Sequence, residues 1–359
     1  MSECLMFGMD CEARNMTSVM GDEENVSFLV GTNNIKADNV VNKLYVDPEA
    51  TRLMSKSYRH PAGEVRAISA HPHKSHVLAT CSANYSSLNG EFALNIWNID
   101  EDKRTLEKLS ELKLDSLNYG LDWDQTTMKA VAIGAETVAI YDMSNEPKLD
   151  QSIKIDEEGS EIYSAKWSSH YEGNMLGLTI GKNVRCVDVR TPRDFLKVAN
   201  AHSHRALSMD FNPNLQHVIA TCGDDGYIRI WDTRSSKSAL MSLHPHAHWV
   251  WQVKYHPVHD QLLLSVGSDA CVVLSCAQSV SSEQNEQEEE VEDEEEMEKS
   301  MNIEKLSDGT LERIDEHEDS VYACAWSSAD PWTFASLSYD GRMILSKVSR
   351  KHKYALMQL

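Results

Sequence analysis

Serine, histidine and aspartate recur together in this sequence, and the three can form the catalytic triad of a hydrolase. A histidine precedes an aspartate by 23 residues three times: His202 and Asp225, His246 and Asp269, and His317 and Asp340. A hydroxyl residue lies four positions before each aspartate: Thr221, Ser265 and Ser336. An active site needs such a trio only once, and the sequence has no Gly-x-Ser-x-Gly turn to expose a nucleophile. The repetition therefore favours a structural role.

The repeated trio instead fits a hydrogen-bonded relay between strands. Trp231 follows Asp225 by six residues, so the segment 201–232 carries His, Thr, Asp and Trp. This set resembles the tetrad of WD40 blades, in which the aspartate holds the histidine and the hydroxyl connects it to the indole N–H. Such a relay pairs polar groups that are buried between strands. Ser275 and Ser346 occupy the tryptophan position in the other two segments, which we expect to lack the final link.

A longer repeat sets the positions of these residues. Aromatic residues end short apolar runs at intervals of 44, 44, 44 and 71 residues: Trp123, Trp167, Phe211, Tyr255 and Trp326. A period of this length fits WD40 blades and also helical HEAT or armadillo repeats. The local pattern decides between them, because β-branched runs flank a Gly-Asp turn within 218–232 and no run has the periodicity of a long helix. The repeats are predicted to be β-blades.

Seven runs have the character of a third blade strand: Val40–Val46, Ala93–Asn98, Val138–Asp142, Val184–Val189, Tyr227–Asp232, Cys271–Ser275 and Arg342–Val348. The sequence therefore predicts an all-β fold, a single seven-bladed WD40 β-propeller. We assign residues 1–278 to blades 1–6, 279–300 to a disordered acidic insertion, and 301–359 to the end of blade 6, blade 7 and a C-terminal strand. The first strand of the first blade is expected within Leu5–Ala13. Either Lys353–Leu359 or the N-terminus closes the ring, since an unpaired blade edge favours aggregation.

Charge and composition restrict the function. The chain has 359 residues, of which 41% are hydrophobic, and a formal net charge of -22. This charge argues against binding nucleic acid, where Lys and Arg supply most of the affinity, and against direct docking on anionic lipid. The sequence has no export signal, no apolar run long enough to span a membrane, and no Cys-x-x-Cys pair among its eight cysteines. We therefore expect a soluble, monomeric, cytoplasmic protein with reduced thiols.

The negative charge is concentrated in one segment. Of the 16 residues from Glu283 to Glu298, 11 are acidic and none is basic. With only Val291 and Met297 as apolar members, this segment cannot bury enough surface to offset the entropy lost on ordering. It is expected to be a solubilising loop or, alternatively, an acidic docking site for a basic partner.

Other motifs give no support for metal or cofactor chemistry. His244, His246 and His248 alternate, a spacing that zinc could use on an extended strand. However, His246 already belongs to the repeated trio, and the sequence has no P-loop, Gly-x-Gly-x-x-Gly or His-Glu-x-x-His motif. We predict no metal, cofactor or catalytic residue.

A propeller presents short loops around its central channel, and these loops carry the predicted protein-binding surface. The residues expected there either begin inner strands or precede the turn aspartates: Glu64, Arg205, Trp249 and Ser320 in the first group, and Asp224 and Tyr339 in the second. Trp, Tyr and Arg dominate the energetics of protein interfaces, which singles out Arg205, Trp249 and Tyr339. The alternative is that Trp249 only packs against Trp251.

The C-terminal half carries the most specific motifs. Five of them follow one another in this order: Ala201-His-Ser-His-Arg, Cys222-Gly-Asp-Asp-Gly, Trp231-Asp-Thr-Arg, His248-Trp-Val-Trp-Gln-Val-Lys-Tyr and Glu316-His-Glu-Asp-Ser-Val-Tyr-Ala. Over residues 200–350 the chain resembles the WD-repeat proteins that interact with the endosome-associated recycling protein (EARP) and Golgi-associated retrograde protein (GARP) tethering complexes.

That resemblance implies a non-enzymatic scaffold that binds EARP and GARP. It implies that the scaffold promotes their recruitment to recycling endosomes or the trans-Golgi network, with indirect membrane contact. It also implies a supporting role in endosome-to-Golgi retrieval, endosomal recycling and the sorting of dense-core vesicle cargo.

A second interpretation rests on the sequence from Trp231 to Arg234, with an echo at Val187–Arg190. It resembles the Trp-Asp-x-Arg signature of the substrate receptors of cullin–RING ubiquitin ligases, and Asp232 and Arg234 would be its motif residues. A chromatin-binding propeller is a third interpretation, favoured only by the acidic segment. The proteins that co-purify with the chain would distinguish the three.

Overall fold

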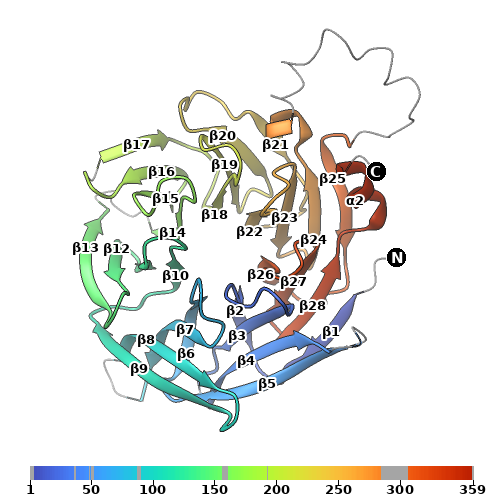
Figure 1. Ribbon diagram of the computed structural model, residues 1–359. Coiled ribbons are helices and arrows are strands. Elements are labelled where there is room, and N and C mark those ends of the chain that lie inside the picture. Colours follow the sequence, from blue (N-terminus) through green and yellow to red (C-terminus); the bar gives the residue numbers. More distant parts are fainter. Residues whose placement is uncertain are drawn as a thin grey trace, which may run out of the picture.

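Seven four-stranded antiparallel sheets are arranged in a ring (Figure 1). The computed structural model describes residues 4–35, 38–47, 49, 52–86, 90–155, 161–191, 193–283 and 306–357. Each sheet is one blade of a propeller, and the blades follow one another in chain order. The prediction of an all-β, seven-bladed β-propeller is confirmed.

The first four blades each use four consecutive strands, and their bounds are as follows. Blade 1 consists of β2 (Ala13–Ser18), β3 (Ser27–Thr32), β4 (Asn39–Val46) and β5 (Leu53–His60). Blade 2 consists of β6 (Glu64–Ala70), β7 (Val77–Asn84), β8 (Glu91–Asp100) and β9 (Thr105–Leu114). Blade 3 consists of β10 (Gly120–Trp123), β11 (Lys129–Ile133), β12 (Thr137–Asp142) and β13 (Lys148–Lys154). Blade 4 consists of β14 (Ile162–Trp167), β15 (Met175–Ile180), β16 (Asn183–Asp188) and β17 (Arg193–Val198).

The remaining three blades complete the ring. Blade 5 consists of β18 (Ala206–Phe211), β19 (Val218–Gly223), β20 (Ile228–Asp232) and β21 (Met241–Leu243). Blade 6 consists of β22 (Val250–Tyr255), β23 (Leu262–Gly267), β24 (Val272–Cys276) and β25 (Gly309–Ile314). Blade 7 consists of β26 (Val321–Trp326), β27 (Thr333–Ser338), β28 (Arg342–Lys347) and β1 (Leu5–Gly8). All seven predicted third strands are confirmed, since they overlap β4, β8, β12, β16, β20, β24 and β28.

The core lies between neighbouring blades. Every residue of β3, β15, β19, β23 and β27 is buried, because each blade packs between its two neighbours in the ring. The inner strands are also joined directly. A carboxylate oxygen of Asp122 accepts the backbone N–H of Trp167 at 3.0 Å, and Asp210 accepts that of Tyr255 at the same distance. The repeated aromatic residue is thus held both by its buried ring and by its backbone.

The N-terminus closes the ring, and this corrects two of our sequence assignments. β1 pairs antiparallel with β28, from Leu5 opposite Leu345 to Gly8 opposite Arg342. Leu5–Gly8 is therefore the outer strand of blade 7, and the first strand of blade 1 begins only at Ala13. The predicted C-terminal strand is wrong, because Arg350–Met357 forms a helix, α2, which buries Leu356 against blade 7. β1 and α2 lie on the same side of the ring (Figure 1).

The predicted acidic insertion is described only at its start. Gln278–Val280 form a 3-10 turn, and Ser282 donates its hydroxyl to Asp260 at 2.7 Å. Residues 284–300, which carry most of the predicted disordered segment, lie outside the described residues. The first residues of the insertion are therefore attached to the propeller rather than separate from it.

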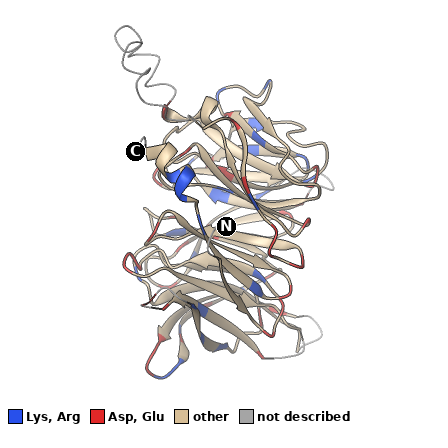
Figure 2. Cartoon of the chain, turned by 90° about the vertical axis from the view of Figure 1, so that its right-hand side faces the viewer, with Lys and Arg blue, Asp and Glu red and all other residues tan. Residues whose placement is uncertain are grey.

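Charged residues of both signs are interspersed over the blades (Figure 2). Three basic residues of α2 contribute to this surface: Arg350, Lys351 and Lys353. In the part of the chain that the structure describes, no helix is long and apolar enough to cross a membrane.

Candidate interaction surface

The two faces of the ring carry different loops. Inner strands begin on one face, which we call the upper face; it holds the loops between blades and the turns between second and third strands, and so both His202 and Asp225. The opposite, lower face holds the remaining turns, including those of Asn214 and Arg234. The predicted binding residues all belong to loops of the upper face.

The complete relay of blade 5 has the predicted geometry. The Nδ1 atom of His202 lies 2.9 Å from the carboxylate of Asp225, and its Nε2 atom lies 3.0 Å from the hydroxyl of Thr221. The indole N–H of Trp231 donates to the same hydroxyl at 3.0 Å. Gly223 leaves room for the relay, since a Cβ atom there would lie 2.8 Å from the imidazole. The relay therefore connects the upper-face loop to three strands.

Two groups that can only donate contact this relay. The indole N–H of Trp231 donates to the hydroxyl of Thr221, and Nη1 of Arg229 lies 2.7 Å from Nδ1 of His202. Burial lowers the pKa of His202, which favours the neutral imidazole. Burial opposes ionisation of Asp225, but hydrogen bonds from His202 and Arg229 outweigh it and hold the pKa of this carboxyl well below its usual range.

The relays of blades 6 and 7 are shorter. His246 lies 2.8 Å from Asp269 and 2.9 Å from Ser265, but the hydroxyl of Ser275 has no partner among the described residues, as the missing tryptophan predicts. In blade 7, His317 contacts Ser336 at 2.8 Å.

The direct contact expected between His317 and Asp340 is wrong. The Nδ1 atom of His317 lies 2.9 Å from the hydroxyl of Ser338, and Ser338 in turn donates to Asp340. The physical reason is that Ser338 takes the place of the carboxylate beside the buried imidazole, so the half-exposed Asp340 stays at the rim.

Blade 2 contains a fourth relay that the sequence analysis missed. His60 lies 3.0 Å from the hydroxyl of Thr80, to which the indole of Trp97 donates at 2.8 Å. The backbone oxygen of Gly63, 2.8 Å from Nδ1 of His60, takes the place of an aspartate. A spacing of 17 residues between Thr80 and Trp97 hides this relay, because blades 5 and 2 differ in the length of their hairpins.

The relays are unsuited to catalysis. The hydroxyl residues of the three repeated trios, Thr221, Ser265 and Ser336, are at most 1% exposed, so no substrate can reach a nucleophile there. Among the described residues, no group of three His, Cys, Asp or Glu side chains is arranged to hold a metal ion. His246, the central one of the three alternating histidines that zinc could use, is hydrogen-bonded to Asp269 and Ser265.

Three of the predicted binding residues form one cluster on the upper face. Arg205 donates from Nε to Asp224 at 2.8 Å, and its guanidinium lies 4.9 Å from the ring of Trp249. Trp249 is half-buried and also packs edge-on against Trp251, with ring centroids 5.6 Å apart. Trp249 therefore packs with Trp251, as the alternative interpretation predicts, and is held by Arg205 as well.

Tyr339 lies in a second cluster that continues the first. The rings of Trp251 and Tyr322 are 4.7 Å apart, and the guanidinium of Arg14 lies 4.8 Å from the ring of Tyr322 and 4.7 Å from that of Tyr339. The hydroxyl of Tyr339 donates to Glu12 at 2.6 Å. Aromatic and arginine side chains are thus in contact across blades 5, 6, 7 and 1.

The other two predicted residues play lesser parts. Glu64 is only 3% exposed and pairs with Arg66 at 3.2 Å, so the arginine and not the glutamate faces outward. Ser320 accepts the backbone N–H of Tyr339 at 3.0 Å through its carbonyl oxygen, which positions that tyrosine. The more accessible side chain in this part of blade 2 is therefore Arg66 and not the predicted Glu64.

The inner strands share a device that the sequence analysis missed. Six of the seven have a register shift near their start, and each shift skips one residue: Arg14, Arg66, Tyr163, Leu207, Trp251 and Tyr322. Such a bulge re-aims a side chain. These residues, with Tyr119, line a cavity of about 280 Å³ on the upper face, which we call the channel mouth. These positions could have been recognised in the sequence, since five of the seven residues lie four positions before the repeated aromatic residue.

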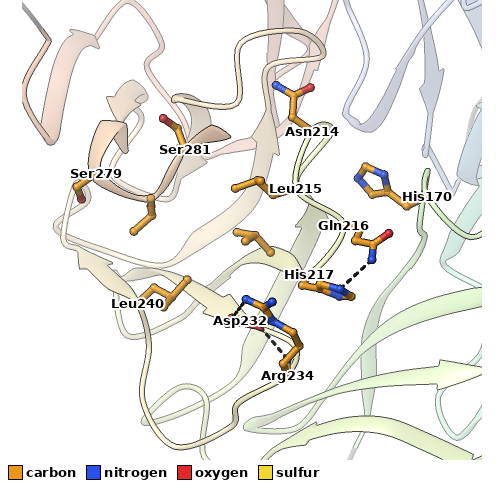
Figure 3. Close-up of a pocket in the computed structure, with 12 residues that line it drawn as sticks. His170, Asn214, Leu215, Gln216, His217, Asp232, Arg234, Leu240, Ser279 and Ser281 are labelled. Atoms are coloured by element: carbon orange, nitrogen blue, oxygen red, sulfur yellow. Dashed lines mark hydrogen bonds and ion pairs between the residues drawn. The ribbon is translucent and has the colours of Figure 1, made fainter. Parts of the chain in front are cut away.

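The lower face holds a larger cavity of about 580 Å³, at the turns of blades 4 and 5 and the start of the acidic insertion (Figure 3). Arg234 and Asp232 lie on its wall, where the guanidinium donates to both carboxylate oxygens at 2.6–3.1 Å. Arg190 pairs with Asp188 in the same way in blade 4. The two residues of the alternative ligase motif are therefore paired with one another, with Arg234 exposed and Asp232 mostly buried.

The ring of blades and its relays define the class of protein, a WD40 β-propeller. A family model described as EIPR1 beta-propeller matches residues 1–275, and a model described as WD domain, G-beta repeat matches residues 309–345. The chain is 67% identical to EARP-interacting protein 1 of Caenorhabditis elegans over the whole of both chains. It is 33% identical to EARP and GARP complex-interacting protein 1 of Homo sapiens, with 98% of each chain covered. The chain belongs to the EIPR1 β-propeller family, and the resemblance noted in its sequence is confirmed.

Proposed function

We propose that this chain is a non-enzymatic scaffold that binds the EARP and GARP tethering complexes. Membership of the EIPR1 β-propeller family and the names of its relatives support this function. The scaffold would promote the recruitment of both complexes to recycling endosomes or the trans-Golgi network. It would thereby support endosome-to-Golgi retrieval, endosomal recycling and the sorting of dense-core vesicle cargo.

The observation that carries the proposal is the continuous cluster of aromatic and arginine side chains on the upper face. Protein interfaces derive most of their binding energy from a few Trp, Tyr and Arg residues near the centre of the contact. Arg205, Trp249, Trp251, Tyr322 and Tyr339 provide this composition, and their mutual contacts hold them in place before a partner arrives. Preorganised side chains lose less entropy on binding, which raises affinity.

The buried relays support a scaffold rather than an enzyme, because their hydroxyls serve as hydrogen-bond links. The net charge of -22 opposes direct adsorption to anionic membranes. We therefore place the protein in the cytoplasm, with a peripheral location at endosomes and the trans-Golgi network that depends on its protein partners.

Affinity purification followed by mass spectrometry tests this function. Tagged wild-type protein should recover EARP and GARP subunits, and Trp249→Ala should recover less of both. Arg234→Ala, on the lower face of blade 5, is the matched control and should recover wild-type amounts. Recovery of a cullin adaptor without tethering subunits would refute the proposal and favour a ligase receptor instead.

A further inference from the structure

We propose that the channel mouth binds an acidic peptide segment of the tethering partner, with carboxylates paired to Arg14 and Arg66 and one apolar side chain among the rings. This inference rests on the proposed function, because it assigns the chemistry of the segment that the upper face would bind.

The charge of the channel mouth differs from that of the chain as a whole. Two arginines and no carboxylate line the cavity, whereas the chain has a net charge of -22. Arg14 is exposed, and its guanidinium lies over the rings of Tyr322 and Tyr339 and beside the Tyr339 hydroxyl. A guanidinium has five N–H donors, so a contact with one hydroxyl leaves donors that can bind a carboxylate in a bidentate manner.

Arg66 is available for a similar reason. It is half-buried, and its Nη1 atom donates to Glu64 at 3.2 Å, which holds the guanidinium at the rim of the cavity. A guanidinium has five N–H donors, so the contact with Glu64 leaves donors for a second carboxylate. Because Arg14 and Arg66 belong to adjacent blades, one extended segment can reach both.

An unpaired acceptor in the cavity wall favours a peptide over a simple anion. The Oδ1 atom of Asn33 is buried and has no hydrogen-bond partner among the described residues, and Asn33 lines the channel mouth. A buried acceptor without a partner costs free energy that a ligand N–H would recover. A peptide supplies such backbone N–H groups, whereas a carboxylate ion alone has no donor.

The size and lining of the cavity fit one anchoring side chain. A volume of about 280 Å³ lies just below the usual range for small-molecule sites, so the cavity is too small for a folded element. Tyr119, Tyr163, Trp251 and Tyr322 supply flat, partly apolar walls. The hydroxyl of Tyr119 donates to the carbonyl oxygen of Ile162 at 2.6 Å and lies 3.1 Å from that of Gly134, so this wall is already formed.

Binding of purified EARP complex to immobilised full-length chain, measured by biolayer interferometry, tests the inference. The variants are Arg14→Gln/Arg66→Gln, which removes both charges, and Arg14→Glu/Arg66→Glu, which reverses them. We expect affinity to fall about tenfold in the first and by a clearly larger factor in the second. Arg234→Glu on the lower face is the matched control and should stay within about twofold of wild type.

Salt dependence provides a second readout. Raising NaCl from about 0.05 M to about 0.3 M should weaken wild-type binding and leave the Gln variant much less affected, because screening acts on charge pairs. Thermal melting confirms that each variant is folded; if a double variant is not, Arg14→Gln and Arg14→Glu alone provide the same comparison, since Arg14 is exposed.

The outcomes separate the two proposals. If wild-type protein binds EARP and the Gln and Glu variants bind equally well, the acidic segment is refuted while the proposed function stands. If wild-type protein fails to bind EARP, the proposed function fails, and the inference fails with it. Sedimentation with vesicles of phosphatidylcholine and phosphatidylserine that depended on Arg14 and Arg66 would assign the channel mouth to lipid and overturn the inference.

Discussion

The upper and lower faces of this propeller lie at opposite ends of the same strands, but their side chains make different kinds of contact. On the upper face, four buried histidines connect loops to strands, and rings and guanidinium groups contact one another across four blades. On the lower face, Arg234 pairs with Asp232 within one loop beside the larger cavity. The upper-face network consists of rings, guanidinium groups and imidazoles. The lower-face contacts between blades are instead amide and backbone hydrogen bonds, such as Asn214 to Asp260 at 3.1 Å and His170 to the carbonyl oxygen of Asn212 at 2.8 Å.

Under the proposed function, the larger cavity does not lie on the binding face. The lower cavity has about twice the volume, yet polar groups in its wall are already paired, either within one loop, as in Arg234 and Asp232, or between blades, as in His170 and the carbonyl oxygen of Asn212. The channel mouth is smaller, but every blade contributes a residue to it. A partner bound there would contact all seven repeats at once.

The largest effect should come from breaking a relay. Asp225→Ala removes the carboxylate that holds His202 and Arg229, and loss of one partner from a buried charged pair should lower the free energy of unfolding by about 3 kcal/mol. Urea denaturation followed by tryptophan fluorescence measures this change. Asp232→Ala, at the lower end of the same blade, should cost about 1 kcal/mol, because the side chain of its partner Arg234 is 66% exposed and solvent weakens the pair. Equal costs would remove the distinction between the faces.

A second prediction concerns binding. Trp251→Ala removes the ring that connects Trp249 to Tyr322, so the affinity for EARP should fall by about tenfold or more. Leu240→Ala is its lower-face counterpart, since Leu240 is 49% exposed in the wall of the larger cavity, and should leave affinity unchanged. Isothermal titration calorimetry decides; a larger loss for Leu240→Ala would place the partner on the lower face.

A third prediction concerns pH. Burial lowers the pKa of His60 and His317 to about 4, so the folded protein keeps them neutral while the unfolded chain takes up protons below about pH 6.5. Stability is therefore lost on acidification, by about 2 kcal/mol per histidine between about pH 7 and pH 5. His60→Gln should be less stable at neutral pH but lose about 2 kcal/mol less over this range. An unchanged pH dependence of the melting temperature would show that His60 is not buried in its neutral form.

The smallest effect is expected at Arg234. Arg234→Ala breaks an exposed ion pair, so stability should change by less than about 0.5 kcal/mol and EARP affinity should not change. The same thermal melts and titrations measure both. Loss of EARP binding in this variant would contradict its peripheral role and bring the lower face into the interface.

Much of this architecture could be predicted from the sequence, because the repeat acts through short-range patterns. The 23 residues from His202 to Asp225 span the hairpin of β18 and β19, which brings the two side chains into contact in the structure. The role of Leu5–Gly8 could not be predicted in this way, because any alternating run can join either of two sheets. Leu5–Gly8 pairs with β28, which lies near the other end of the chain, and short-range sequence patterns do not specify such a distant pairing.

The surface was only partly predictable for a related reason. Arg205, Asp224 and Trp249 were found because they flank the repeated motif, and the structure brings them together. Arg14 and Arg66 were missed because the first blades lack the aromatic residue that marks the repeat. The relay of His60 was missed because a backbone oxygen replaces the aspartate, and a backbone oxygen leaves no trace in the sequence.

Hydrogen–deuterium exchange of the chain, alone and bound to purified EARP complex, tests the central claim most directly. We predict slower exchange on binding at the starts of the inner strands, around Arg14, Arg66, Trp249 and Tyr322, with no change at the lower-face turns. Protection confined to residues 212–217 and 278–283, which border the larger cavity, would contradict the account and place the partner on the opposite face.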